Sequence, residues 1–513
     1  MKRRKQLCLL VFATLFVGGG VLFAGGQSDV PAGERPVVIV QGADADTLDA
    51  NAVWTVPSMI VFSNIFDTLL DRDDDMNIIP GLAESYELVE PPTRWRFNLR
   101  QDVKFHNGEA FTAASVKFSF DRISAPDSDS LQKGNFSTID RVEIVDDYVV
   151  DIITKDADPI LPARMTMFFM VPPEHVKEVG KETFGTNPVG SGPYKFVSWR
   201  KDDSIELVRN EQYWGGVPEI KRVTFRNMPE TQSRLAALQT GEADIVIGIP
   251  LELAQPLMGS KEFSFESVLS TRVVYAELTP LEKQTDSPLW NEDVRRAINY
   301  AVNRESIIKN LLTGEAEIIP TIVPRGIPGF DSSIEPYNYN PEKAKELLKK
   351  AGYPNGFEIR LYGFVGRLNK DSEIAQAVGG DLDKVGIKTQ VVIEEFGVLA
   401  KNTANKTMTS PYMQSWALPV MDPDQWLWPQ LHSGEFFTRT ENADLDRILE
   451  ASRREMNPEK REELLSQAQR ISHDKAYKLI LFQLKNSYGM SSKISVPLRN
   501  DEMIYLKDAV LVK

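Results

Sequence analysis

The sequence predicts an α/β protein of two lobes, and three observations lead to this expectation. The chain has 513 residues, which is room for roughly three domains or lobes at about 150 residues each. Up to about residue 275 strand patterns dominate, whereas the rest of the chain alternates capped helical patterns with strand-like runs. Hydrophobic residues make up 42% and charged residues 26%, a composition typical of globular proteins with packed cores.

The first half of the chain carries two kinds of strand pattern. Residues 37–40 are a short apolar run, which is typical of a buried strand. Residues 94–105 alternate apolar and polar side chains around Trp95, which predicts a half-buried strand. Residues 141–154 and 204–209 alternate in the same way. We therefore expect strands at all four places.

The second half has helix starts that can be read directly. Asn291 precedes apolar residues at helical spacing and is a suitable N-cap. An asparagine followed by a first-turn proline occurs at residues 340–341 and again at 457–458. Strand-like runs at 357–362 and 387–394 lie between these helices. This order predicts an α/β region.

The N-terminus has the pattern of a secretory signal peptide over residues 1–26. A basic stretch is followed by an apolar run and by small residues at the cleavage site. The apolar run is interrupted by glycines and is short for a membrane span. We expect cleavage before Gln27, a flexible leader over residues 27–36, and a periplasmic protein. Cys8 lies at the start of the apolar run, whereas a lipoprotein carries its cysteine at the end, so lipidation is not expected.

Charge and motifs exclude several classes of function. The chain has 59 basic and 73 acidic residues, a net charge of -14, which disfavours nucleic acids and anionic membranes as partners. The sequence contains no nucleophile elbow, zinc-protease motif, phosphate-binding loop or dinucleotide fingerprint. Its four histidines lack the spacing of metal ligands on a helix. The sequence therefore predicts no catalytic residues, no metal and no cofactor.

Residues 412–432 are the most unusual segment of the chain. Trp416, Trp426 and Trp428 lie here, three of the eight tryptophans, and three prolines favour a stiff loop over a regular helix. Aromatic rings give a large contact area at a low cost in conformational entropy, which suits the wall of a ligand pocket. The alternative is that some of these rings anchor the core.

A series of short motifs indicates a resemblance to a known family. Each motif alone is weak, but their shared order over some 300 residues is specific. The densest motif reads Asn-Pro-Val-Gly-Ser-Gly-Pro-Tyr at 187–194. The others occupy residues 47–49, 65–70, 80–86, 97–100, 103–109, 209–210, 213–214, 241–245, 294–301 and 340–345. The chain resembles the family 5 solute-binding proteins of ABC importers, the peptide, nickel and opine group.

The resemblance implies a two-lobed, hinged periplasmic-binding-protein architecture of the type II-like kind, with a small domain inserted in lobe I. It also implies that the motifs around Gly108 and Gly190 are scaffold turns. Lobe I is expected at residues 37–75, 190–275 and 480–513, the inserted subdomain at 76–189, and lobe II at 276–479.

The function implied by the resemblance is capture of a small solute between the lobes and its delivery to an inner-membrane permease. A ligand that touches both lobes shifts the protein towards the closed form, and no covalent chemistry is needed. We expect a monomer that is not an enzyme. A secreted hydrolase is the alternative from another class of function.

The resemblance also points to site residues. In the dipeptide-binding members, a tryptophan is followed three residues later by an aspartate that pairs with the peptide amine. Trp416 matches this tryptophan, but Pro419 stands where the aspartate is expected. Asp422 and Asp424 are the candidates to replace it, and the sequence does not decide between them. Arg367 matches the arginine of the second lobe that binds the ligand carboxylate.

Two further residues complete the predicted site. Trp54 falls where lobe I of the family lines the cleft, and Tyr275 lies where the chain crosses between lobes. A short peptide is the expected ligand, with an oligosaccharide or an opine-like acid as alternatives. Nickel or haem has less support, because His432 is the one histidine in a suitable place.

Overall fold

The computed structural model describes residues 35–417, 420–435 and 437–512. The predicted signal peptide, most of the predicted leader, Cys8 and Pro419 lie outside the described residues. No helix among the described residues is long and apolar enough to cross a membrane.

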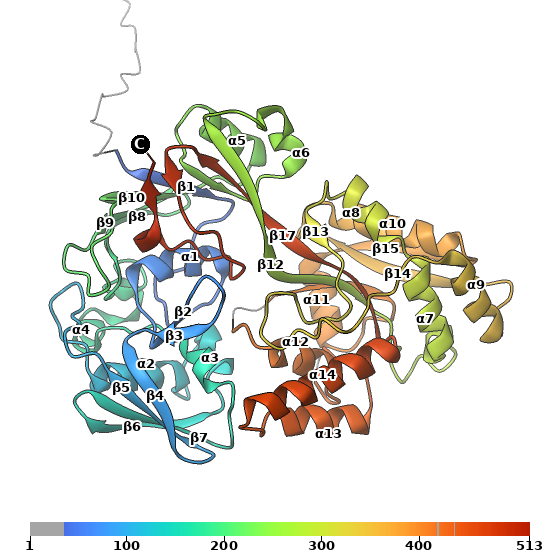
Figure 1. Ribbon diagram of the computed structural model, residues 1–513, viewed down its shortest axis with the longest axis horizontal. Helices are drawn as coiled ribbons and strands as arrows, with labels where there is room; N and C mark the ends of the chain where they lie inside the picture. Colours follow the sequence, from blue (N-terminus) through green and yellow to red (C-terminus); the bar gives the residue numbers. More distant parts are fainter. Residues whose placement is uncertain (1–34, 418–419, 436, 513) are drawn as a thin grey trace, which may run out of the picture. The chain divides into compact units, whose positions relative to one another are not determined.

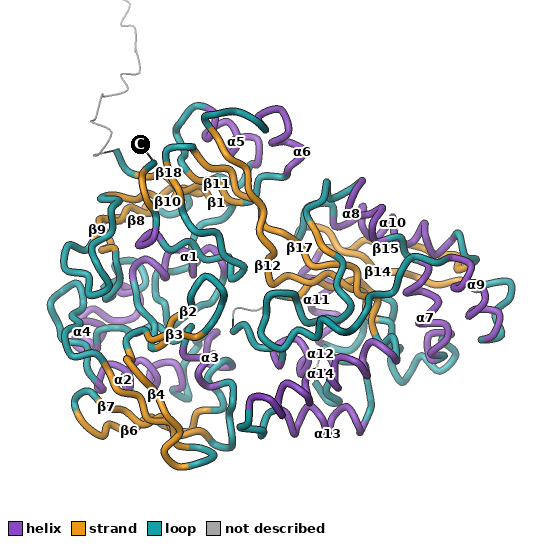
Figure 2. Tube along the Cα trace, viewed as in Figure 1, coloured by secondary structure: helices purple, strands orange, loops and turns teal. Residues whose placement is uncertain are grey.

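One long mixed sheet runs through the described part of the chain (Figures 1 and 2). Its strand order is β15-β14-β16-β12-β17-β11-β1-β10-β9-β8, and the short strand β13 pairs with β17 beside this path. The strands are β1 (Val37–Gln41), β8 (Tyr194–Arg200), β9 (Ser204–Arg209), β10 (Arg222–Asn227), β11 (Ile245–Ile247), β12 (Phe263–Glu277), β13 (Ala316–Glu317), β14 (Phe357–Val365), β15 (Ile387–Glu395), β16 (Tyr412–Trp416) and β17 (Lys478–Ser491).

The antiparallel pair β12 and β17 carries this sheet from lobe I to lobe II. The pair runs from Phe263 opposite Ser491 to Glu277 opposite Lys478, with a register shift between Leu269 and Val273. Near the first end β17 also pairs with β11, and near the other end β12 also pairs with β16. The expected boundaries of lobe II fall on these two strands, and those boundaries stay a prediction.

Lobe I has a core of its own, which packs helix α1 (Val56–Ile65) against the buried faces of β1, β9 and β10. The predicted strand at residues 37–40 is confirmed as β1, all of whose residues are buried. The predicted strand at residues 204–209 is confirmed as β9. Helices α5 (Thr231–Gln239) and α6 (Leu251–Ala254) also lie in the residue range expected for lobe I.

A separate four-stranded antiparallel sheet, in the order β4-β5-β7-β6, lies within residues 83–154. Trp95 and Phe97 belong to its core, and buried and half-buried residues alternate along β5 as the sequence predicted. The sheet falls inside the range expected for the inserted subdomain. Its elements are β4 (Ala83–Glu90), β5 (Arg94–Leu99), β6 (Ile139–Asp146), β7 (Val149–Thr154) and the packed helix α2 (Ala113–Ser124).

Lobe II places helices around β14, β15 and β16. The three predicted asparagine caps are confirmed, since each side chain accepts a hydrogen bond from a first-turn backbone N–H. The capped helices are α7 (Glu292–Ala301), α9 (Pro341–Lys350) and α14 (Pro458–Asp474). The other helices of this lobe are α8 (Arg304–Asn310), α10 (Asp371–Asp383), α11 (Phe396–Ala404), α12 (Asp424–Leu431) and α13 (Ala443–Ser452).

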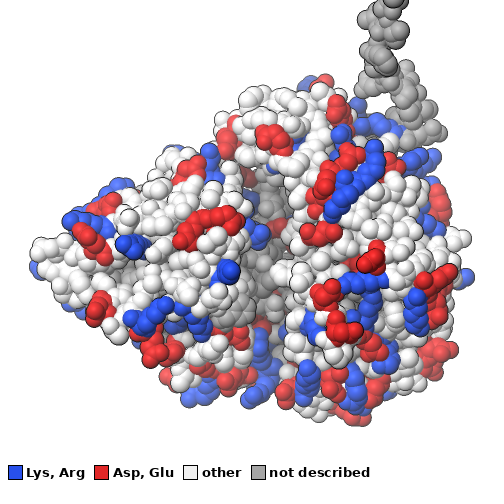
Figure 3. Space-filling model, turned by 180° about the vertical axis from the view of Figure 1, so that it is seen from behind, with Lys and Arg blue, Asp and Glu red and all other residues white. Residues whose placement is uncertain are grey.

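Short elements connect these parts. They are the hairpin β2 (Leu70–Arg72) and β3 (Ile78–Pro80), helices α3 (Leu161–Met165) and α4 (Pro173–Phe184), the pair β18 (Ile494–Ser495) and β19 (Val510–Leu511), and the 3₁₀ turns η1 (Leu131–Gly134), η2 (Gln255–Leu257), η3 (Pro288–Trp290) and η4 (Leu506–Asp508). Figure 3 shows the molecular surface hollowed between the half that carries β14 and β15 and the half that carries β8, β9 and β10.

Candidate functional site

Arg367 lies directly after β14, where the chain turns towards α10. Its backbone N–H donates to Asp371 Oδ2 at 3.0 Å, which fixes the turn. The guanidinium lies over the ring of Phe396, 5.1 Å from its centroid, and the residue is exposed. No described carboxylate forms an ion pair with it. Arg367 is therefore a positive charge held in place by packing.

Arg272 is a second arginine in this region, at the register shift of β12. Its Nη1 donates to Ser415 Oγ of β16 at 3.2 Å, and no described carboxylate forms an ion pair with it. Although the residue as a whole is exposed, desolvation of its guanidinium lowers the pKa of Arg367, and the positive charge of Arg272 lowers it further. The two like charges therefore interact unfavourably.

Glu502, in the C-terminal segment of the chain, also acts on Arg367. Its carboxylate acts in the opposite sense to Arg272 and raises the pKa of Arg367. The sequence analysis missed both Glu502 and Arg272. Neither belongs to a local motif, because both lie far from Arg367 in the sequence.

Trp416 ends β16 and is partly buried. Its ring meets the ring of Phe437 edge to face at a centroid distance of 4.8 Å. Its indole N–H donates to the carbonyl of Gln425 at 3.0 Å, so the polar atom of the side chain is used within the protein. The ring remains the part of Trp416 that can contact a ligand.

The predicted loop after Trp416 contains a helix, which corrects the expectation from its prolines. Helix α12 covers Asp424–Leu431 and includes Pro429. A proline at this position cannot donate to the carbonyl of Gln425, four residues earlier. The indole of Trp416 donates to that carbonyl instead. The helix therefore tolerates the proline without leaving this acceptor unpaired.

Two predicted site residues lie in the core. The side chains of Trp426 and Tyr275 are 0% and 1% exposed and belong to one hydrophobic cluster of lobe II. The hydroxyl of Tyr275 donates to Gln430 Oε1 at 2.6 Å. Neither ring presents a surface to a ligand, so the structure favours the core alternative for both.

Trp428 is stacked on both faces by its own neighbours. The ring of His432 lies parallel to it at a centroid distance of 3.8 Å, and the guanidinium of Arg453 lies over it at 3.5 Å. Its edge lines a cavity of about 190 Å³ together with Asp158 and Arg164 of the range expected for the inserted subdomain. Trp428 cannot stack a ligand on either face.

Asp422 and Asp424 are already neutralised by arginines. Arg461 donates to both oxygens of Asp422 at 2.7 and 2.9 Å, and Arg453 donates to both oxygens of Asp424 at 2.7 and 2.8 Å. Burial alone raises the pKa of Asp422, but Arg461 outweighs it and holds the pKa below its usual range. Because both carboxylates already have an arginine partner, the structure gives no support to the prediction that one of them binds a ligand amine.

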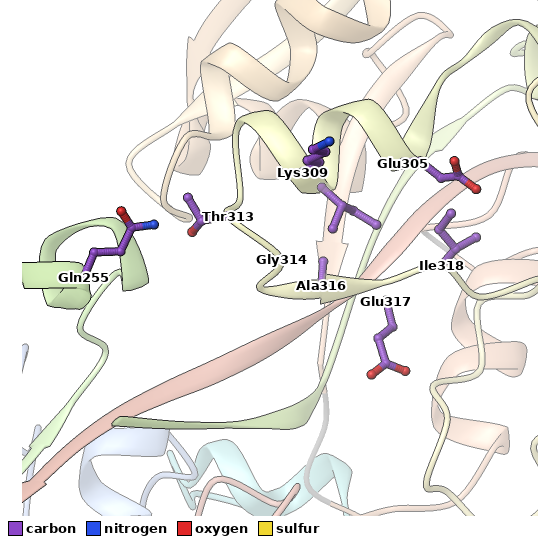
Figure 4. A pocket seen from close by; sticks show the side chains of 9 residues that line it. Gln255, Glu305, Lys309, Thr313, Gly314, Ala316, Glu317 and Ile318 are labelled. Atoms are coloured by element: carbon purple, nitrogen blue, oxygen red, sulfur yellow. The ribbon is translucent and has the colours of Figure 1, made fainter. Parts of the chain in front are cut away.

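Trp54 lies in the loop before α1, partly buried against the core of lobe I. A larger cavity, of about 690 Å³, lies elsewhere, between η2 and the segment from α8 to β13 (Figure 4). Its lining includes Gln255, Lys309 and Glu317 and none of the predicted site residues. No group of three metal-ligating side chains occurs among the residues that the structure describes.

Comparison with known proteins gives the family. Residues 77–438 match the model described as bacterial extracellular solute-binding proteins, family 5 Middle. The chain belongs to this family. It is 33% identical over 393 residues to the glutathione-binding protein GsiB of Pectobacterium atrosepticum, which covers 76% of this chain and 75% of that protein.

Two solved structures have a similar fold. HbpA2 from Haemophilus parasuis has a TM-score of 0.84 at 22% identity, covering 93% of this chain and 100% of that chain. The ABC transporter-associated periplasmic binding protein DppA from Helicobacter pylori, in complex with peptide STSA, has a TM-score of 0.76 at 26% identity, covering 93% and 98%. The predicted family and the two-lobed α/β architecture are confirmed, and the protein is a solute-binding protein of an ABC importer.

Proposed function

We propose that this solute-binding protein captures a short anionic peptide and that Arg272 and Arg367 bind its carboxylates. The observations that carry the proposal are that neither guanidinium pairs with a described carboxylate and that the positive charge of Arg272 lowers the pKa of Arg367. Like charges repel, and a bound anion removes that repulsion. Arginine is also suited to carboxylates because its N–H groups donate in pairs.

The relatives support a peptide. The relative at 33% identity is named as a glutathione-binding protein, and the DppA structure contains a four-residue peptide. Glutathione is a tripeptide with two carboxylates and one amine, so two arginines match its negative groups. The ring of Trp416 and the half-buried Trp54 are the proposed apolar contacts.

The remaining parts of the proposal follow the physics of a hinged receptor. A ligand that contacts both lobes favours their closure, and the closed protein delivers the ligand to an inner-membrane permease without chemical turnover. We further propose a monomer in the periplasm, exported by cleavage of residues 1–26 and not lipidated. The inserted subdomain at residues 76–189 and the lobe boundaries given above belong to this proposal.

The test is calorimetric titration of the purified protein with glutathione, Met-Leu and Ser-Thr-Ser-Ala. We expect at least one peptide to bind. Arg367→Ala or Arg272→Ala should then weaken its affinity about tenfold to a hundredfold, because each change removes a hydrogen bond to a charged group. Arg360→Ala is the matched control. Arg360 is an exposed arginine on β14, the strand that Arg367 follows. Unchanged affinity in both arginine variants would overturn the proposed site.

The alternatives are separated in the same titration. An opine-like acid such as mannopinic acid also carries a carboxylate, and an oligosaccharide carries none. Tight binding of either one in place of the peptides would change the ligand class and keep the receptor function. Chromatography of the ligand after prolonged incubation tests for a hydrolase, which would convert it into products.

A further inference from the structure

We propose that the two lobes hold each other closed through a latch, in which each lobe inserts one apolar side chain into the core of the other. The latch consists of the tip of hairpin β2–β3, residues 72–77, and the segment 420–422 that precedes α12. This inference concerns the movement of the lobes, so it holds whichever solute is bound and goes beyond the proposed function.

The first support is a reciprocal exchange of buried side chains. Met76, at the tip of the hairpin, is 1% exposed and belongs to the hydrophobic cluster of lobe II that contains Tyr275 and Trp426. Val420 is 0% exposed and belongs to the core of lobe I, which packs α1 against β1. Separation of the lobes would return both side chains to water, so their burial favours the closed form.

Arg72 adds a direct hydrogen bond to this contact. Its Nη2 donates to the carbonyl of Val420 at 2.8 Å, and its Nη1 donates to the carbonyl of Met76 at 2.5 Å. The side chain is buried, and its Nε has no hydrogen-bond partner among the described residues. A buried donor without a partner is costly. The latch therefore combines favourable apolar burial with an opposing cost, which keeps closure reversible.

The hairpin tip is fixed to its own lobe. Lys507 Nζ donates to Asp71 Oδ2 at 3.0 Å, and Arg499 Nη1 donates to the carbonyl of Arg72 at 3.0 Å. Within the turn, Asp73 Oδ1 accepts the backbone N–H groups two and four residues later, at 3.0 and 2.8 Å. The tip is thus a preformed turn that loses little conformational entropy when it docks.

The segment 420–422 is fixed to lobe II in the same way. Met421 is buried in the cluster of lobe II. Arg461 of α14 donates to both oxygens of Asp422 at 2.7 and 2.9 Å. Val420, directly before these two anchored residues, is the one that lies in the core of lobe I. Neighbouring residues of one short segment therefore belong to different lobes.

The backbone gives independent support. Met76 and Met421 have φ values of 66° and 58°, in the left-handed region that residues with side chains seldom adopt. Glycine adopts this conformation without strain. A methionine there costs backbone energy, and what it adds is its side chain. For Met76 that side chain lies in the cluster of the opposite lobe, which is the contact that the latch requires.

The experiment is small-angle X-ray scattering of the ligand-free wild type, Met76→Gly and Val420→Ala. Met76→Gly removes the inserted side chain and leaves a turn that glycine adopts readily. Each variant should lower the ratio of closed to open protein about tenfold, because less apolar surface is buried on closure. We therefore expect a larger radius of gyration in both variants than in the wild type.

Two control variants make the same chemical changes away from the latch. Asp202→Gly replaces an exposed residue with a φ of 62°, and Val217→Ala shortens a valine that is 51% exposed. Both should keep the radius of the wild type. Equal radii for the wild type, M76G and V420A would overturn the latch. Thermal unfolding completes the test, since a lower melting temperature with an unchanged radius would make Met76 and Val420 core residues only.

Titration with glutathione and Met-Leu provides a second measurement. The apparent dissociation constant varies inversely with the fraction of protein that is closed, so M76G and V420A should bind a peptide up to about tenfold more weakly. An affinity equal to that of the wild type would count against the latch. Absence of binding by any peptide to the wild type would refute the proposed function alone, because the radii decide the latch without a ligand.

Discussion

The indole N–H of Trp416 donates to the backbone carbonyl of Gln425 at 3.0 Å. Pro429, four residues further along α12, cannot donate a hydrogen bond to this carbonyl because proline has no backbone N–H. One side chain therefore completes the helix that the proline would interrupt. The end of strand β16 and the start of α12 are tied together by this bond.

Trp416→Phe should lower the free energy of unfolding by about 1–3 kcal/mol, because the carbonyl of Gln425 loses its donor. Pro429→Ala restores a backbone N–H at the place where that carbonyl needs one. In the double variant W416F/P429A the loss should therefore be smaller than the sum of the two single changes. Urea unfolding followed by far-ultraviolet circular dichroism measures all four proteins. Additive effects would show that the bond and the proline are not coupled.

Asp422→Ala should destabilise the unliganded protein by about 3 kcal/mol. The change leaves the guanidinium of Arg461, which is 11% exposed, without its bidentate partner, and an uncompensated buried charge is costly. Asp444→Ala is the control, because Asp444 and Arg447 form an exposed pair worth at most about 1 kcal/mol. Denaturant unfolding distinguishes the two. Similar losses for both variants would mean that the Asp422 pair is not a buried contact.

His106 should make stability depend on pH between about 6.5 and 4. Burial lowers its pKa to about 4, against an unfolded value of about 6.5. The unfolded chain therefore binds a proton in this window before the folded protein does. Stability is complete above pH 6.5 and falls as the pH drops towards 4, by at most ~3 kcal/mol.

The variant His106→Gln isolates this effect, because glutamine does not titrate. Its free energy of unfolding should vary less between pH 4 and 6.5 than that of the wild type. The measurement is urea unfolding at a series of pH values in a constant ionic strength. Parallel pH profiles for the two proteins would contradict a buried neutral His106.

Gly190→Ala should lower stability by about 3 kcal/mol or more, or prevent folding. A Cβ built on Gly190 would lie 2.0 Å from the carbonyl oxygen of Ile65, a distance that no relaxation of a flexible side chain can relieve. Gly134→Ala is the matched control, since no atom lies within 4 Å of its Cβ position. Thermal unfolding compares the two variants. A stable G190A protein would show that the close approach is not required.

Local patterns made much of the fold predictable. The N-caps at Asn291, Asn340 and Asn457 were found because a cap needs only its own side chain and the next three backbone amides. Strand alternation was equally local, as β5 and β9 show. Helix α12 was missed because the donor that permits its proline comes from Trp416, outside the helix.

The site was less predictable, because it depends on contacts between distant residues. Trp426 and Tyr275 are buried because other parts of the chain pack around them. An expectation based on the local abundance of aromatic residues does not include that packing. The arginine partner of Asp424 is Arg453, which directly follows α13, and the partner of Asp422 is Arg461 of α14. Arg272 and Glu502 have no local motif, so only the folded chain shows that their charges act on the pKa of Arg367.

The path of the long sheet has a consequence for the order in which the exported chain can fold. Strand β11 of lobe I pairs on one side with β1 and on the other with β17, which is made of residues 478–491. Until those residues have also crossed the membrane, β11 has a free edge and lacks one of its two partner strands. The part of the sheet that contains β1 and β11, although it begins near the start of the chain, therefore needs residues from near the chain's end to complete its pairing. A truncated polypeptide ending before β17 would expose this edge and be prone to aggregation.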